Sequence, residues 1–297
     1  MAVHEGQLSA TLSTQGTAIR VVHDAFDETP PSVHDQLFYV GEVRPIVEYG
    51  LTEYLGVELQ LPVRIVRTTI VFRDAAGEPL ASSEGGELHH RNETLFGLSD
   101  PWLSSRFYWH AGGLTLTGRL GVTVPVGRTE QNPFALGRAG LTHQHIQLGT
   151  GTFNPLAAVD AAYTVGRFSF RGYAQAQLTL YDNDKGYRAG SRYGAGVLAE
   201  ARVVGDLRLA LGADVLDEQP ERWDGVIEQD GNVGRTDVLV GGSVGYRFGD
   251  LLVTLGVKVP VYQHFKQVGD HDPGQLTYPA IVSLSAQTSV DLRSSAR

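Results

Sequence analysis

The stretch TVGRFSF, from Thr164 to Phe170, reverses the direction of the chain around Gly166. Strand-forming residues enter and leave this turn, and its central glycine permits the positive φ that a tight hairpin needs. The same plan recurs in HAGGLTL, VVGDLRL, RFGDLLV and EYGLTEYLG, which begin at His110, Val203, Arg247 and Glu48. The chain therefore repeats one local device, a tight glycine turn between two strand-like segments.

Apolar and polar residues alternate in the segments between these turns. In GLTLTGRLGVTVPVG, which starts at Gly113, Leu114 and Leu116 fall on one parity, and Thr115 and Arg119 fall on the other. A period of two is typical of a strand with one apolar face. Segments starting at Arg167, Asp206 and Asp250 repeat it over ~10 to 14 residues, about twice the usual length of a soluble strand. With the weaker segments, we predict about twelve strands and almost no helix.

Long and short connections alternate along this series of strands. The long ones cover about residues 16–35, 74–100, 128–142, 217–234 and 266–275, and the glycine turns lie between them. An even number of long antiparallel strands with this alternation is the plan of an outer-membrane barrel. We therefore predict an all-β fold in which residues 1–297 form one transmembrane up-and-down antiparallel β-barrel, with long external loops and short glycine-containing periplasmic turns.

A soluble β-sandwich is the alternative, since its strands also alternate. Soluble strands are shorter, however, and nothing makes their connections alternate in length. Aromatic residues favour the barrel, because they gather near the tight turns on the apolar parity, as an interfacial girdle would. These residues are Tyr49, Phe107, Trp109, Tyr163, Phe168, Phe170, Tyr246 and Phe248.

Composition excludes several classes of function. A net charge of −9 argues against nucleic acid as a partner, because phosphate-binding surfaces need clustered excess Lys and Arg. Without any cysteine the chain has no thiol chemistry. No stretch has the length and apolarity of a membrane helix, and the N-terminal residues do not form a signal peptide. We expect a leader to have been removed from a protein of the outer membrane of a Gram-negative bacterium, with the lipid bilayer as its partner.

Three stretches carry a family resemblance: LFGLSDPWLSSRFYW (95–109), GRLGVTVPVGRTEQNPFALG (118–137) and GTGTFNPLAAVDAAY (149–163). They resemble proteobacterial outer-membrane barrels described as transporters of the phenol meta-cleavage pathway type. The resemblance implies a barrel with a transport function and names no solute. Two departures are the ending DLRSSAR, which lacks a terminal aromatic residue, and the lack of an obvious N-terminal plug segment.

The polar parity of the strands is strongly charged, with both signs present. In a barrel of this size that parity lines a narrow lumen. Each arginine there is either a solute contact or half of a cross-strand ion pair. Arg171, Tyr173, Gln175 and Gln177 form one inward strip that combines a cation, an aromatic ring and two amides. The full set of predicted lumen-facing residues is Arg106, Tyr108, His110, Arg119, Arg171, Tyr173, Gln175, Gln177, Arg208 and Lys258.

The motif THQHIQLGTG suggests a possible metal site. If it is a strand, His143 and His145 lie on one face, ~6 to 7 Å apart, within reach of a common Zn or Cu ion. Further potential ligands occur in or beside the long loops: His89, His90, His264, His271, Glu87, Glu93 and Asp270. Loop histidines that are merely solvated or bonded to backbone are the alternative.

The sequence predicts passive movement of a small organic or weakly anionic solute through an outer-membrane channel. The alternatives are a Zn- or Cu-binding receptor that uses His143 and His145, and an outer-membrane lipid hydrolase. A hydrolase needs a nucleophile and a histidine base at the lipid-facing rim, and no G-x-S-x-G motif is present. We therefore predict that the protein is not an enzyme and that it needs no cofactor beyond that possible metal.

Overall fold

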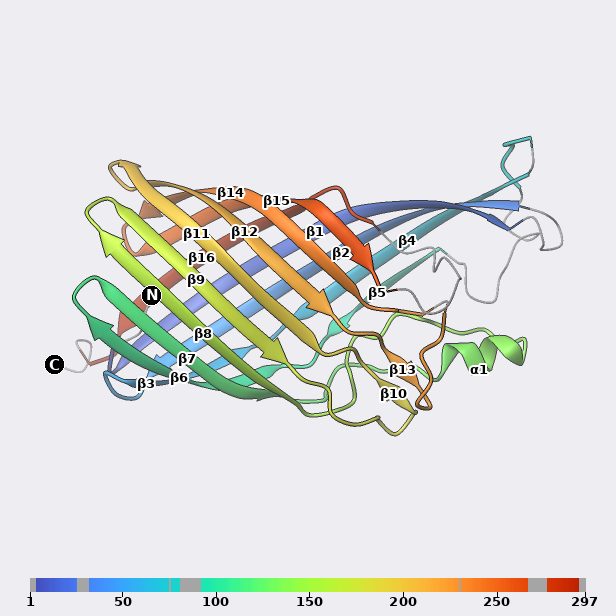
Figure 1. The fold of residues 1–297 in the computed structure, drawn as a ribbon, viewed down its shortest axis with the longest axis horizontal. Helices are drawn as coiled ribbons and strands as arrows, with labels where there is room; N and C mark the ends of the chain where they lie inside the picture. Colours follow the sequence, from blue (N-terminus) through green and yellow to red (C-terminus); the bar gives the residue numbers. More distant parts are fainter. Residues whose placement is uncertain are drawn as a thin grey trace.

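The computed structural model describes residues 4–25, 32–74, 76–80, 92–229, 231–266 and 277–293. These residues form a closed antiparallel barrel of twelve strands with two extra strands in the same sheet (Figure 1). The predicted fold class is thereby confirmed. No helix in the described part of the chain has the length and apolar character required to cross a bilayer.

The elements follow the order of the chain. The strands of the main sheet are β1 (Gln7–Ala25), β2 (Ser32–Gly50), β3 (Leu55–Gln60), β4 (Val63–Arg73), β5 (Glu93–Leu98), β6 (Trp102–Ala111), β7 (Leu114–Thr123), β8 (Asn154–Val165), β9 (Phe168–Gln177), β11 (Arg192–Val204), β12 (Leu207–Glu218), β14 (Arg235–Phe248), β15 (Leu251–Phe265) and β16 (Ile281–Asp291). The external loops carry α1 (Pro133–Arg138), β10 (Tyr187–Arg188) and β13 (Arg222–Trp223).

The barrel closes between its first and last strands. β1 pairs with β16 from Gln7 to Gly16 and with β2 along its whole length. Because each of the twelve barrel strands then has two neighbours, the ring that they form has no open edge, as the interior of a bilayer requires, whereas among the described residues the extra strand β5 pairs only with β4. In Figure 1 the tight turns lie at the end where both termini are, and the long connections lie at the opposite, external end.

Two strands of the barrel wall are interrupted by proline. Leu61 and Pro62 separate β3 from β4, and Ser99 to Pro101 separates β5 from β6. Proline cannot donate to a strand ladder, so both breaks fall where the pairing changes. The lower pieces, β3 and β6, pair with each other, whereas the upper pieces, β4 and β5, pair with each other above them. β4 and β5 are the two strands in excess of twelve.

The tight turns match the sequence prediction in detail at four places. Gly112, Gly166, Gly205 and Gly249 have φ of 57°, 58°, 53° and 59°, each between two paired strands. These values lie in the left-handed region that glycine enters without a Cβ clash. The turn between β2 and β3 instead uses residues 51–54, which have no positive φ.

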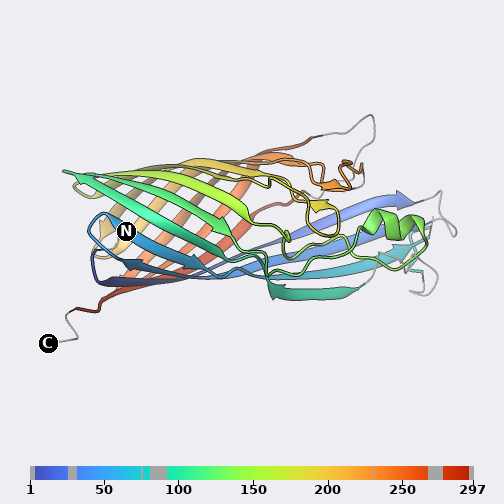
Figure 2. The same ribbon diagram turned by 90° about the horizontal axis from the view of Figure 1, so that it is seen from below.

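The first predicted loop is wrong. Residues 16–35 were expected to be irregular, but β1 runs to Ala25 and β2 begins at Ser32. The two strands pair from Leu8–Tyr49 up to Ala25–Ser32, and β4 pairs with the upper part of β2. The strands therefore rise above the barrel as a sheet, because cross-strand pairing continues where the other strands have ended (Figures 1 and 2).

Other loop boundaries also differ. The predicted loop 74–100 contains β5, and β12 continues to Glu218, inside the predicted loop 217–234, which also contains β13. The connection predicted at 128–142 is longer, because no strand is present between Thr123 and Asn154. Most of the predicted loop 266–275 lies outside the described residues.

Two belts of outward aromatic residues mark the membrane boundaries. Seven of the eight predicted aromatic residues are exposed near the tight turns, and Tyr49 is half-buried. A second belt lies toward the external end and consists of Tyr39, Phe96, Phe153, Tyr181 and Tyr262. Tyr39 and Tyr49 are ten residues apart on β2. At ~3.4 Å per residue and a strand tilt of ~45°, this separation spans about 25 Å, the height of a lipid-facing apolar band.

Candidate solute pathway in the barrel lumen

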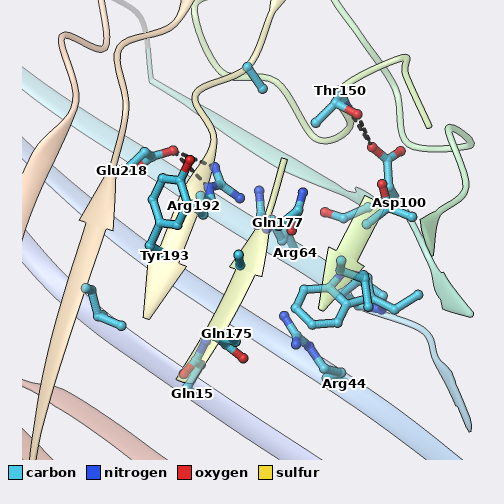
Figure 3. Close-up of a pocket in the computed structure, with 18 of the residues that line it drawn as sticks. Gln15, Arg44, Arg64, Asp100, Thr150, Gln175, Gln177, Arg192, Tyr193 and Glu218 are labelled. Carbon is cyan, nitrogen blue, oxygen red and sulfur yellow. Dashed lines mark hydrogen bonds and ion pairs between the residues drawn. The ribbon is translucent and has the colours of Figure 1, made fainter. Parts of the chain in front are cut away.

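A chamber of about 630 Å³ occupies the external half of the lumen. Its wall comes from all sides of the barrel, including Gln15 on β1, Arg64 on β4, Gln177 on β9 and Arg192 on β11 (Figure 3). A loop segment, from Gln147 to Thr150, also lines it. The chamber is therefore enclosed by strands that lie far apart in sequence and only meet because the barrel closes.

The cationic side chains of the chamber wall are held in ion pairs. Arg192 contacts Glu218 at 2.8 Å, and Arg235 contacts Asp237 at 2.9 Å. Arg44 contacts Glu42 at 2.7 Å and lies over the ring of Trp102, 4.8 Å from its centroid. These pairs fix the direction of each guanidinium and leave N–H groups at the rim of the cavity. The amides of Gln15, Gln175 and Gln177 add neutral donors and acceptors to this wall.

A smaller cavity of about 100 Å³ shares Arg119, Ala158 and Gln175 with the chamber. Arg106, Arg171 and Tyr173 complete most of its polar wall. The smaller cavity therefore continues the lumen from the chamber toward the tight-turn end, and we call this region the narrow part.

Four charged side chains, which we call the Glu58 quartet, form one side of this narrow part. Glu58 is 2% exposed and accepts hydrogen bonds from Arg106 at 2.8 Å and Arg119 at 3.2 Å. Arg106 also donates to Glu48 at 2.9 Å. Gln60 donates a further hydrogen bond to Glu58 at 2.7 Å. Two carboxylates and two guanidinium groups thus make a neutral group on β2, β3, β6 and β7.

More open pairs lie beyond the quartet, on β8, β9, β12 and β15. Arg171 contacts Asp160 at 2.5 Å, with the arginine side chain 54% exposed. The hydroxyl of Tyr173 donates to Asp214 at 2.6 Å, and Lys258 contacts the same carboxylate at 2.7 Å. An exposed cation at this position can contact a passing anion, whereas the buried arginines of the quartet are committed to carboxylates.

The predicted lumen residues separate into three groups. Arg119, Gln175, Gln177 and Lys258 line the chamber; Arg106, Arg171 and Tyr173, with Arg119 and Gln175 again, line the smaller cavity. Three others line neither cavity: Tyr108, His110 and Arg208. Tyr108 is buried beside Arg106, His110 contacts Thr115 near a tight turn, and Arg208 contacts Glu200. Parity alone predicted that these side chains point inward, but not their height along the lumen.

Several chamber residues were absent from the prediction. Gln15 was missed because its strand was expected to end there, and Arg44 and Arg64 lie on the polar parity but were not among the predicted lumen-facing residues. Trp102 could have been found from its parity, since it is separated from Arg106 by an even number of residues on β6. Asp100 and Thr150 belong to irregular segments, where alternation carries no information.

The three stretches that carried the family resemblance meet at one point, which we call the Asp100 knot. Asp100 is 6% exposed and accepts hydrogen bonds from the backbone of Gly127 at 2.9 Å and of Thr150 at 2.7 Å. The Thr150 hydroxyl donates to it as well, at 2.7 Å (Figure 3). Gly127 and Gly149 approach so closely that a Cβ on Gly149 would lie 2.6 Å from the Gly127 Cα. The knot ties both ends of loop 124–153 to the break between β5 and β6.

The external loops pack on one another beyond the knot. The rings of Tyr187 and Trp223 pack against each other with centroids 4.7 Å apart and planes inclined by 40°, and Phe134 of α1 packs against them. Burial raises the pKa of the Tyr187 hydroxyl. Burial also raises the pKa of Glu221 to about 7, although the backbone of Asn232 and the indole of Trp223 donate to this carboxyl. We call these packed loops the external cover.

The proposed metal site is only partly supported by geometry. The segment from Leu141 to Gln147 is not a strand, so the expectation that His143 and His145 share a strand face is wrong. Their rings nevertheless contact each other, with centroids 5.0 Å apart. No three His, Cys, Asp or Glu residues gather as a metal-binding group within the described ranges. His89, His90, His271, Glu87 and Asp270 lie outside those ranges. Metal binding therefore stays a prediction without a third ligand.

The geometry defines an outer-membrane β-barrel with a polar, narrowing lumen. Comparison with known proteins agrees: a family model described as "Putative MetA-pathway of phenol degradation" matches residues 10–269. Because that match covers most of the chain, the protein belongs to this family. The resemblance drawn from the three sequence stretches is thus confirmed.

Solved structures are also similar to this chain. The COG4313 outer membrane channel from Pseudomonas putida F1 has a TM-score of 0.64 and 13% identity, with 97% of each chain covered. The toluene transporter TodX of P. putida has a TM-score of 0.45 and 9% identity, over 96% of this chain and 90% of that chain. No curated protein sequence matches. The first of these similarities confirms the fold.

Proposed function

We propose that this protein is a passive outer-membrane channel for a small organic or weakly anionic solute. The solute enters the chamber from the external side and passes the narrow part between the Glu58 quartet and Arg171. The observation that carries this proposal is the chamber of about 630 Å³, which shares wall residues with the smaller cavity below it.

The chemistry of the wall supports a polar solute with an apolar part. Guanidinium and amide groups alternate with Trp102, Leu156 and Leu239 around the chamber. A flat organic acid would place its carboxylate on the N–H groups and its apolar part on these side chains. Two structural neighbours are described as a channel and a toluene transporter, which agrees with a small organic solute.

The test is conductance of the folded barrel in a planar bilayer. We expect discrete steps and a reversal potential that favours anions in a salt gradient. Arg171→Ala removes the exposed cation of the narrow part, so it should reduce both the anion preference and the anion conductance. Arg208→Ala is the matched control, because Arg208 also points inward but lines neither cavity. A folded barrel that gives no steps, and no uptake of small organic acids into liposomes, would overturn the proposal.

A further inference from the structure

Three arginines lie on the outer face of the sheet that rises above the barrel. Arg20 pairs in register with Leu37, Arg67 with Tyr39, and Arg73 with Val33. On β4 the even-numbered residues from Val66 to Phe72 are buried, so Arg67 and Arg73 belong to the opposite, outward parity. On β1 the neighbour Ile19 is buried and Arg20 is exposed. All three guanidinium groups thus leave the sheet on the side that faces away from the lumen.

This group of arginines, which we call the rim arginines, begins at the external edge of the membrane. Arg67 lies beside Tyr39, which belongs to the external aromatic belt. Directly below, on the same face, Ile65 and Phe96 are 44% and 70% exposed, as lipid-facing residues are. Arg20 and Arg73 lie farther along the sheet in the external direction. The rim arginines therefore continue the lipid-facing surface into the headgroup layer.

Among the side chains that the structure describes on this face, the rim arginines carry an excess of positive charge. Asp35 contacts Arg20 at 2.8 Å and Arg73 at 4.0 Å, so one carboxylate serves two guanidinium groups. Within the described residues Arg67 has no ion pair, and its side chain is exposed. Across the sheet, Arg20 and Arg67 are separated by two inter-strand spacings, and along the strand direction by two residues. Their Cα atoms are therefore about 12 Å apart. Flexible arginine side chains can cover the space between them.

We propose that the rim arginines bind the phosphate groups of the anionic glycolipid in the outer leaflet. Guanidinium groups match phosphate oxygens with paired, charge-assisted hydrogen bonds. One phosphorylated lipid can make both apolar contacts with the barrel wall, through its acyl chains, and polar contacts above them, through its phosphates. Its acyl chains pack on Ile65 and Phe96, and its headgroup contacts Arg67. The occupant is a lipid and not a free anion, because the cationic surface is continuous with the lipid-facing band.

The test measures lipid retention by the folded, detergent-solubilised barrel in the presence of a chelator of divalent cations. The probes are diphosphorylated lipid A and the same glycolipid with its phosphates removed, followed by native mass spectrometry. We expect tighter binding of the phosphorylated probe. Arg67→Gln with Arg73→Gln should weaken that binding tenfold to thirtyfold, since each surface arginine contributes about 1 kcal/mol toward an anionic lipid surface. Binding of the dephosphorylated probe should not change.

Arg167→Gln with Arg202→Gln is the matched control, because both of these exposed arginines lie at the tight-turn end. This control variant should bind the phosphorylated probe like the unmodified protein. If the rim double variant fails to fold, as judged by heat-modifiable gel migration, Arg67→Gln alone should still weaken binding about fivefold. Equal affinity for both probes, equal binding by the rim and control variants, or displacement of the lipid by an equal concentration of inorganic phosphate would each overturn the proposal.

Discussion

The Asp100 knot and the Glu58 quartet both bury carboxylates inside the barrel, but they stabilise different things. Asp100 accepts from neutral groups, two backbone amides and a hydroxyl, and so holds a loop in place. Glu58 accepts from two guanidinium groups and so joins strands that are already paired. One carboxylate determines where a loop lies, and the other balances charge in the narrow part of the lumen.

Because of this difference, removal of Glu58 and removal of Asp100 should have different effects on stability. Without Glu58, Arg106 and Arg119 have only Glu48 as a carboxylate partner in the quartet, which leaves one positive charge uncompensated inside the wall. Without Asp100, the freed backbone groups belong to a loop that can move out and bind water. The quartet should therefore affect the stability of the whole barrel, and the knot should affect the loop.

The largest effect should follow Glu58→Ala. We expect a loss of about 3–5 kcal/mol in the free energy of unfolding, because breaking a buried ion pair from one side leaves the other side unpaired. Urea unfolding in detergent, read from the loss of heat-modifiable migration, measures it. Combining Glu58→Ala with Arg119→Ala should cost less than the sum of the single changes. Additive losses would mean that the quartet does not act as a unit.

Asp100→Ala should have a smaller effect. We expect a loss of about 1–3 kcal/mol in the free energy that holds loop 124–153 in place, without a comparable loss in the barrel. We expect protease cleavage within this loop to become faster while the urea midpoint of the barrel stays nearly constant. Asp182→Ala is a suitable control, because Asp182 also carries an ion pair near the external rim, with Arg188. A barrel midpoint that falls as far as in Glu58→Ala would remove the distinction between knot and quartet.

The external cover should respond to pH through Glu221. Its pKa is raised by burial from 4.5 to about 7, so the packed cover favours the protonated carboxyl. Stability of the cover should be complete below pH 4.5 and decline as the pH rises through 7. Fluorescence of Trp223 or protease cleavage of the loops, followed from pH 4 to pH 8, measures the decline.

In Glu221→Gln this pH dependence should disappear. Glu228→Gln, in the same loop and paired with Arg138, should retain it. An unchanged profile in Glu221→Gln would assign the pH response to another group of the cover, such as the neighbouring Glu218.

The smallest effect on stability should follow Arg171→Gln. Its side chain is 54% exposed, so the pair with Asp160 should contribute less than about 1 kcal/mol. The urea midpoint should stay within error of the unmodified barrel, even though the ion selectivity changes. A loss comparable to that of Glu58→Ala would show that both sides of the narrow part are structural.

The sequence predicted the wall of the barrel better than its contents. Alternation and glycine turns were sufficient for strand number, orientation and the aromatic belt, because each depends on neighbours along the chain. The extension of β1 to Ala25 was missed, since pairing with β2 and β4 maintains it. Likewise, parity assigned Arg208 and Arg119 to the same inward face and could not separate a residue outside both cavities from one that lines both.

By itself, the sequence determined an outer-membrane barrel with a charged lumen, because a period of two and the length of connections are local properties. Only the tertiary structure decided which charges meet. Glu58 and Arg119 are 61 positions apart, and Asp100 and Thr150 are 50 apart. Pairing of β3 with β6 and of β6 with β7 brings Glu58 and Arg119 within hydrogen-bonding distance. Strand register, and not sequence separation, thus determines where the lumen is filled by ion pairs and where it leaves a chamber.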